Sequence, residues 1–155
     1  MFTKILLTFL ISMVPIIELR GAVPFGVAMG VNPFVALAVS IIGNMIPVPF
    51  IYLFARKFLE WGKDVKFLSK ICKWVLKKGE KGGKKLTAKT GQSVYVALLL
   101  FVGIPLPGTG AWTGTLAASL LDLNHKKTTI AVLCGIAVAG AIMLTLSLLG
   151  LVALG

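Results

Sequence analysis

Two charged side chains stand apart in a long apolar stretch, and they are the residues of this sequence best suited to chemistry. Glu18 and Arg20 are the only acidic or basic residues between Lys4 and Arg56. An ionisable residue at membrane depth costs about 2.5–3.5 kcal/mol to insert, so it usually lines a cavity, finds a partner or serves a function. The planar donors of Arg20 suit an anionic group such as phosphate, and a buried carboxylate such as Glu18 suits proton exchange. The alternative is a buried ion pair that holds a turn together.

A second unusual segment, residues 103–114, supplies further binding candidates. Two prolines and four glycines in twelve residues cannot form ordinary helix interior. The backbone amides of such a turn, with Gly110, Trp112 and the hydroxyls of Thr109 and Thr113, are suited to bind an anion. A tightly packed tip that simply needs glycine is the alternative. The segment lacks the Gly-Lys-Ser/Thr ending of a nucleotide-binding P-loop and the glycine spacing of a dinucleotide fingerprint.

The remaining polar residues predict no catalytic set. Asn44 lies in an apolar run, where it either makes a hydrogen bond between helices or contacts a substrate. His125 is the only histidine and follows no nearby carboxylate pair, and Cys72 and Cys134 have no companion at metal-ligand spacing. We therefore expect no enzyme activity, no metal and no cofactor.

The elements that position these residues are predicted to be membrane helices. The chain of 155 residues is 57% hydrophobic with only 14% charged residues, whereas soluble domains carry about 25%. Residues 31–55 and 128–154 are uncharged and long enough to cross a hydrocarbon core of about 30 Å. The sequence therefore predicts an all-α polytopic membrane protein built as a single membrane domain over residues 1–155.

A formal net charge of +11 would suggest nucleic acid for a soluble protein, but twelve of the sixteen lysines and arginines lie between residues 56 and 89. Basic residues near membrane spans stay on the cytoplasmic side, so residues 56–90 are predicted to form a cytoplasmic amphipathic helix and a flexible linker. We expect this segment to bind membrane lipids, because each lysine near an anionic leaflet contributes about 1 kcal/mol. We expect no binding of nucleic acid. The lysines expected to contact anionic headgroups are Lys63, Lys66, Lys70, Lys73 and Lys77.

Two other apolar stretches are too short or too broken to cross the membrane. Residues 4–30 are predicted to enter it, turn at residues 18–24 with Pro24, and return. Residues 91–121 are predicted to do the same, with a turn formed by Pro105, Pro107 and Gly108. Non-helical backbone at such depth is tolerated only where protein or a water-filled cavity surrounds it. Both segments are therefore interpreted as re-entrant hairpins, each followed by a transmembrane helix.

The two hairpin-plus-helix units show a weak internal repeat. Asn32 precedes Gly43 by eleven residues, and Asn124 precedes Gly135 by eleven. With the basic segment and the lysines after Asn124 on one side of the membrane, the two units would be inverted. Many transporters build a midplane site from such inverted repeats.

Three motifs carry a resemblance to a known family: residues 17–24 (Ile-Glu-Leu-Arg-Gly-Ala-Val-Pro), Gly43-Asn44 followed by Pro47-Val48, and residues 105–114 (Pro-Leu-Pro-Gly-Thr-Gly-Ala-Trp-Thr-Gly). Over essentially the whole chain, the sequence resembles the putative small multidrug export protein family. The order of elements is also similar in architecture to the DedA (SNARE-associated/VTT) membrane proteins, some of which move lipid phosphates. Those proteins carry arginines around the second hairpin, and this sequence has none there.

The resemblance implies a multi-pass transporter of the prokaryotic plasma membrane. Together with Arg20 it favours an anionic or amphipathic substrate, such as a lipid phosphate, moved between leaflets with proton coupling through Glu18. One alternative is an exchanger of protons for cationic drugs at Glu18. Another is a membrane scaffold that transports nothing and acts through its lysines. A homodimer is consistent with the small size of the chain, although no residue demonstrates one.

Overall fold

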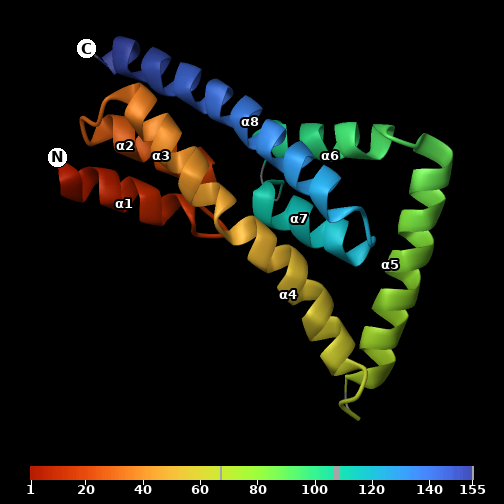
Figure 1. Ribbon diagram of the computed structural model, residues 1–155. Helices are drawn as coiled ribbons and strands as arrows, with labels where there is room; N and C mark the ends of the chain where they lie inside the picture. The colour runs from red at the N-terminus through yellow and green to blue at the C-terminus, as the bar shows by residue number, and fades with distance from the viewer. Residues whose placement is uncertain (67, 107–108, 155) are drawn as a thin grey trace.

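The computed structural model describes residues 1–66, 68–106 and 109–154, and this part of the chain contains helices and connecting turns without strands. Figure 1 shows two groups of helices that pack side by side and a long helix that projects away from them. The helices are α1 (Phe2–Ser12), α2 (Glu18–Ala28), α3 (Pro33–Met45), α4 (Pro47–Gly62), α5 (Ser69–Thr90), α6 (Ser93–Gly103), α7 (Ala111–Leu120) and α8 (His125–Leu154).

The first hairpin consists of α1 and α2, which pack against each other and against α3. Its turn covers residues 13–17, with Pro15 at the centre, so the predicted turn at residues 18–24 is wrong. Pro24 lies inside α2. The fixed backbone angle of proline fits a helix, but Pro24 cannot donate to the carbonyl group of Arg20 and its ring crowds that carbonyl, so the packing of α2 against its neighbours must offset this cost. Glu18 and Arg20 therefore both lie in the first turn of α2.

The span after the first hairpin is longer than residues 31–55. Asn32 caps α3, because its side-chain oxygen accepts hydrogen bonds from the amides of Phe34 and Val35. The helix is interrupted at Ile46, immediately before Pro47, and continues as α4 to Gly62. Proline cannot donate to the carbonyl group four residues earlier, which accounts for the interruption before Pro47. The helix ends seven residues beyond the predicted boundary at residue 55.

The second hairpin consists of α6 and α7, joined by an irregular segment, and α8 follows as a long span. Pro105 lies in that segment, as predicted, whereas Pro107 and Gly108 fall outside the described residues. The helices α6 and α8 form the most extensive packing in the structure, and α7 packs mainly on α4 of the other unit. Likewise α2 packs on α8, so each hairpin contributes one helix to the span of the opposite unit.

The two units share backbone features at a constant spacing of 92 residues. Gly30 and Asp122 both have positive φ angles, 78° and 55°, at the ends of α2 and α7. The residue after each donates its amide hydrogen to a carbonyl five residues earlier, at 3.0 Å in both cases. Asn32 and Asn124 then cap the spans, the latter by accepting a hydrogen bond from the amide of Lys127 at 3.2 Å.

The glycines of the weak sequence repeat also occupy matching places. A Cβ atom added at Gly43 would lie 2.7 Å from the carbonyl oxygen of Phe9 in α1, and one added at Gly135 would lie 2.7 Å from that of Leu99 in α6. Glycine is required at both positions because the first helix of each hairpin touches the backbone of the following span. These matches support a structural repeat, while its inverted orientation in a membrane stays a prediction.

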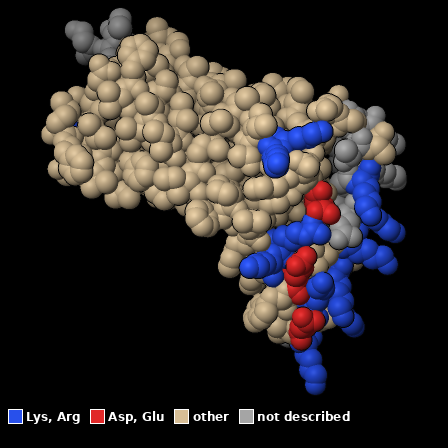
Figure 2. Space-filling view, in the orientation of Figure 1, with Lys and Arg blue, Asp and Glu red and all other residues tan. Residues whose placement is uncertain are grey.

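The basic segment forms an arm at one end of the molecule. After α4 ends, residues 63–66 and 68 lie in turns, and α5 begins at Ser69, so Lys63 and Lys66 do not belong to the predicted amphipathic helix. The flexible linker predicted for residues 79–85 is helical, because α5 continues to Thr90. Lysine has a high helix propensity, and the lysines of this segment partly offset the low propensity of its glycines. Figure 2 shows lysine and arginine side chains gathered over this arm.

The rest of the surface is suited to lipid. Two helices are long and apolar enough to cross a membrane, Pro33–Gly62 and His125–Gly150. Large apolar side chains are exposed on every side of the helical body, including Phe34, Phe50 and Ile130, each more than 60% exposed. Such exposure is far beyond the isolated apolar patches of soluble proteins, and it fits a membrane protein.

Candidate functional site

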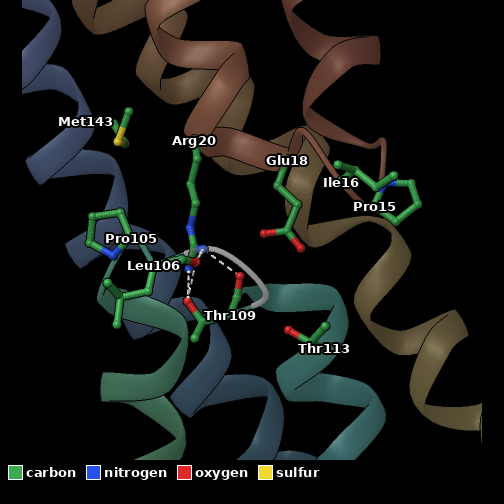
Figure 3. Close-up of a pocket in the computed structure, with 9 residues that line it drawn as sticks. All are labelled: Pro15, Ile16, Glu18, Arg20, Pro105, Leu106, Thr109, Thr113 and Met143. Atoms are coloured by element: carbon green, nitrogen blue, oxygen red, sulfur yellow. Dashed lines mark hydrogen bonds between the residues drawn. The ribbon is translucent and has the colours of Figure 1, made fainter.

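A cavity of about 420 Å³ lies where the two hairpins meet. Figure 3 shows Glu18 and Arg20 extending from the start of α2 toward the irregular segment of the second hairpin and the first turn of α7. Both charged residues therefore lie where the sequence predicted a site, and the second motif lies opposite them. The residues that line the cavity are Pro15, Ile16, Glu18, Arg20, Pro105, Leu106, Thr109, Thr113 and Met143.

The carboxylate of Glu18 binds the amino-terminal end of α7. Its Oε2 accepts a hydrogen bond from the amide of Ala111 at 3.2 Å, and its Oε1 accepts one from the amide of Trp112 at 3.0 Å. The first amides of a helix have no partner within the helix and carry the positive end of its dipole. A negative side chain at this place is therefore stabilised, although it comes from a residue 93 positions earlier in the chain.

The guanidinium of Arg20 binds the carboxyl-terminal end of α6 and the segment after it. Nη1 donates to the carbonyl oxygens of Leu106 and Thr109, both at 2.5 Å. Nη2 donates to the carbonyl oxygens of Val102 and Ile104, both at 3.1 Å, and to the hydroxyl of Thr109 at 2.9 Å. The last carbonyls of a helix favour a positive charge, so Arg20 supplies to α6 what Glu18 supplies to α7.

The two side chains bind these backbone groups, whereas the alternative considered from the sequence was an ion pair between them. None of the ion pairs within 4 Å in the described residues joins Glu18 to Arg20. Two side chains two positions apart on a helix point in different directions, and the structure uses this divergence to reach both ends of the broken second hairpin. Together Glu18 and Arg20 hold the tip of the second hairpin from both sides. Each hydrogen bond to a charged group contributes about 1.5–3 kcal/mol.

Gly110 packs closely against the carboxylate of Glu18. It has a φ angle of +150°, and a Cβ atom there would overlap the Oε atoms of Glu18. Glu18 itself has a φ angle of +50°, which is uncommon for a residue with a side chain. Such unfavourable angles persist where the surrounding structure enforces them, and they concentrate at functional sites. The close fit explains why the second motif is rich in glycine.

The other predicted site residues lie around the same centre. Asn44 is 2% exposed and its side chain faces the Glu18 carboxylate, and its Oδ1 atom has no partner among the described residues. The hydroxyl of Thr109 accepts from Arg20, while Thr113 contributes to the cavity wall. Trp112 binds Glu18 through its backbone, and its ring faces a neighbouring apolar cavity. The fold thus gathers all seven predicted binding residues.

Sequence reasoning missed the contacts that fix α7 against α4. The hydroxyl of Ser119 donates to the carbonyl of Tyr52 at 2.7 Å, and the hydroxyl of Tyr52 donates to the carbonyl of Leu123. Arg56 forms an ion pair with Asp122. Asp122 is the only acidic residue after Glu80, and this isolation was the signal that could have marked it.

The sequence was compared with models of known protein families. The model of the putative small multi-drug export protein family matches residues 18–142. The chain belongs to this family. The matched region begins at Glu18, directly after the turn of the first hairpin, and includes Asn44, the second hairpin and more than half of α8. The membership identifies a membrane-associated protein of the transporter type and agrees with the two long apolar helices.

The family name describes export in general terms and leaves the substrate to be found. No curated protein matches the chain, and no solved structure matches it either. The architectural similarity to the DedA proteins therefore stays a prediction. Within the small multi-drug export family, the charged cavity at the hairpin tips is the feature of this member from which a substrate class can be argued.

Proposed function

We propose that the protein is a small membrane exporter that binds an amphipathic substrate in the cavity between its two hairpins. The observation that carries this proposal is the pair of opposite charges, Glu18 and Arg20, at the end of a cavity whose other walls are mainly apolar. Ligand sites combine an apolar lining with a few polar groups that orient the ligand. Discontinuous helices whose ends meet at such a site are a recurrent design of transporters.

The hydrogen bonds at the site favour a positively charged substrate head. All the donors of the two terminal nitrogens of Arg20 are directed at five protein acceptors. The carboxylate of Glu18 has about four lone-pair sites; the backbone of α7 uses two of them and the side chain of Asn44 lies at a third. Glu18 therefore keeps acceptor capacity and its negative charge, whereas Arg20 keeps only its Nε–H as a further donor, and this balance favours a cationic or donor-bearing head.

An anionic substrate, such as a lipid phosphate, would have to replace carbonyl groups around Arg20. The guanidinium geometry suits phosphate well, and the exchange would release Leu106 and Thr109 from the side chain that holds them. This second candidate couples binding of the anion to opening of the second hairpin. It predicts that Arg20, and not Glu18, determines which substrates bind.

In the favoured version, Glu18 exchanges among three partners. The carboxylate binds the first amides of α7 when the cavity is empty, a cationic head when substrate is present, and a proton during the return step. Only the first of these states leaves α7 bound to α2. Binding of either ligand therefore weakens one contact between the hairpins, which is the kind of differential interaction that a conformational change requires.

The test is transport by purified protein in proteoliposomes with an inward or outward pH gradient. The probes are dodecyltrimethylammonium, which is cationic, and dodecyl phosphate, which is anionic. We expect proton-driven movement of the cation by the unchanged protein and its loss in Glu18→Gln. The matched control is Asp64→Asn, which removes an exposed carboxylate outside the cavity and should transport at the unchanged rate.

Three outcomes would count against the proposal. Movement of dodecyl phosphate that Arg20→Gln abolishes and Glu18→Gln leaves intact would assign the anionic substrate instead. Equal transport by Glu18→Gln, Arg20→Gln and the unchanged protein would remove the cavity from the mechanism. Absence of transport, combined with membrane effects that depend on the lysines of α5, would favour the scaffold function.

A further inference from the structure

A second cavity, of about 540 Å³, adjoins the charged one. The two cavities share Pro15, Ile16 and Thr113 in their walls, so they lie next to each other at the turn of the first hairpin, and the two together are called the depression. The second cavity has no charged side chain in its wall. Its lining consists of Pro15, Ile16, Ile51, Phe54, Ala55, Phe58, Trp112, Thr113 and Leu116.

The wall contributed by α4 is one continuous apolar stripe. Ile51, Phe54, Ala55 and Phe58 follow the spacing of three and four residues that places side chains on one face of a helix. Opposite this stripe, Trp112 and Leu116 are contributed by α7. The cavity is therefore a groove between two helices that are fixed to each other near Tyr52, and its width is set by the fold.

An aromatic series continues from the groove toward the basic arm. The ring centroids of Phe54 and Phe58 are 6.1 Å apart, and those of Phe58 and Trp61 are also 6.1 Å apart. Trp61 is 61% exposed and lies one residue before the end of α4. Tryptophan at the end of a membrane helix typically lies at the level of the lipid headgroups. The series thus leads from the membrane surface at the basic arm to the charged cavity.

We propose that this groove is a subsite for the apolar chain of the substrate, which enters it sideways from the bilayer along α4. The inference rests on the proposed export function and adds where the apolar part of the substrate lies. With the charged head at Glu18, the chain would cross Thr113 and lie between α4 and α7. An amphipath partitioned into the leaflet beside the basic arm reaches the site along the three aromatic rings without passing through water.

Because the charged cavity and the apolar groove adjoin, we expect the groove to hold the apolar chain of a substrate and not only the chain of a bilayer phospholipid. A phospholipid chain could cover the outer part of the groove, but its headgroup would lie at the membrane surface near Trp61. The charged end of the depression, at Glu18, would then stay empty. A single-chain amphipath fills both parts, because its charged and apolar regions have the same order as the walls of the depression.

The experiment uses the single tryptophan of the groove as a reporter. In a Trp61→Phe, Trp74→Phe protein, Trp112 is the only tryptophan, and an alkyltrimethylammonium probe with a brominated chain quenches it on contact. The comparison protein also carries Trp112→Phe and places a tryptophan on the lipid-facing surface by Val96→Trp, since Val96 is 57% exposed on α6. Both are reconstituted in phosphatidylcholine nanodiscs and titrated with the probe.

We expect saturable quenching of Trp112 at probe contents where the lipid-facing tryptophan is quenched only in proportion to the probe in the bilayer. Ala55→Phe, which fills the groove without touching the charged cavity, should remove the saturable part and lower transport of dodecyltrimethylammonium at least tenfold. Transport of the short-chain butyltrimethylammonium should fall less than twofold in this variant. The shift in chain-length preference distinguishes a filled groove from a misfolded protein.

The inference is overturned if Ala55→Phe leaves saturable quenching and the chain-length preference unchanged, or if both tryptophans are quenched in parallel. If transport still depends on Glu18, either result rejects the groove as a substrate subsite and leaves the proposed export function unaffected. Loss of any dependence on Glu18 would instead remove the proposed function itself, and the groove as its subsite with it.

Discussion

Gly110 lies directly against the carboxylate of Glu18, and the two positions are separated by the same 92 residues that separate the capping residues Asn32 and Asn124. The contact therefore joins corresponding positions of the two similar units, and both hairpins contribute residues to the charged cavity beside it.

Gly110→Ala should strongly destabilise the protein. The change places a Cβ atom on the Glu18 carboxylate at a φ angle that alanine disfavours. Gly30→Ala is the matched control, because Gly30 also has a positive φ angle and no described atom lies within 4 Å of an added Cβ. The control pays about 1–2 kcal/mol for the backbone angle, and Gly110→Ala should cost about 1–3 kcal/mol more from overpacking. Thermal unfolding in detergent measures both, and equal losses would contradict the described contact.

Arg20→Lys should loosen the tip of the second hairpin even though the charge is kept. An ammonium group has three donors at a single point, and it cannot reach carbonyls spread from Val102 to Thr109. Hydrogen exchange should then rise at least tenfold at the amides of Leu106 and Thr109, as a loss of about 1.4 kcal/mol implies.

The control for Arg20→Lys lies within the same protein. The amide of Val14, in the turn of the first hairpin, donates to the carbonyl of Ile11 at 3.1 Å. It has no part in the Arg20 contacts and should exchange at an unchanged rate. Faster exchange at both turns would indicate general unfolding, and no change at either would show that Arg20 does not hold the tip.

The sequence predicted the elements whose local chemistry is explicit. Asparagine followed by proline, as at Asn32, is typical of a helix start, and α3 begins there. The many glycines and prolines of residues 103–114 predicted the irregular segment of the second hairpin. The position of the first turn was wrong because Pro24 was interpreted as a helix breaker. Pro24 instead lies inside α2, which continues past it to Ala28, while Pro15 lies in the turn.

The partners of the two charged residues could not be predicted. Glu18 and Arg20 are close in sequence, which suggested an ion pair, but both bind atoms of the backbone more than 80 residues away. Backbone amides and carbonyls occur at every residue, so a sequence pattern does not reveal which of them are left without partners at a helix end. Only the packing of α6 and α7 beside α2 determines this.

The two connections between hairpin and span should be reached from opposite sides of the membrane. The α2–α3 connection lies at the end of the molecule that holds both chain termini, and the α7–α8 connection lies at the other end, near α5 (Figure 1). In a protein with Cys72 and Cys134 replaced, Met29→Cys should react with an impermeant maleimide on intact cells. Lys126→Cys should react only after permeabilisation, and labelling of both from outside would contradict the inverted arrangement.

The lysines of the basic arm should recruit anionic lipid. Lys70 and Lys73 are exposed on α5, and each lysine near an anionic leaflet contributes about 1 kcal/mol. Lys70→Gln with Lys73→Gln should therefore lower the phosphatidylglycerol that co-purifies from a mixed bilayer, most clearly at low salt. Lys4→Gln removes a charge at the opposite end of the molecule and serves as the control; an equal loss per lysine would indicate a nonspecific effect of net charge.

The contact between Glu18 and Gly110 also limits how such a chain can originate by gene duplication. If both halves carried glutamate at this position, two carboxylates would meet at one contact, where even a Cβ atom added at Gly110 overlaps the Glu18 side chain. One of the two halves must therefore carry a small residue there. The exchange Glu18→Gly with Gly110→Glu would keep a single carboxylate at the contact and bring it from the opposite hairpin.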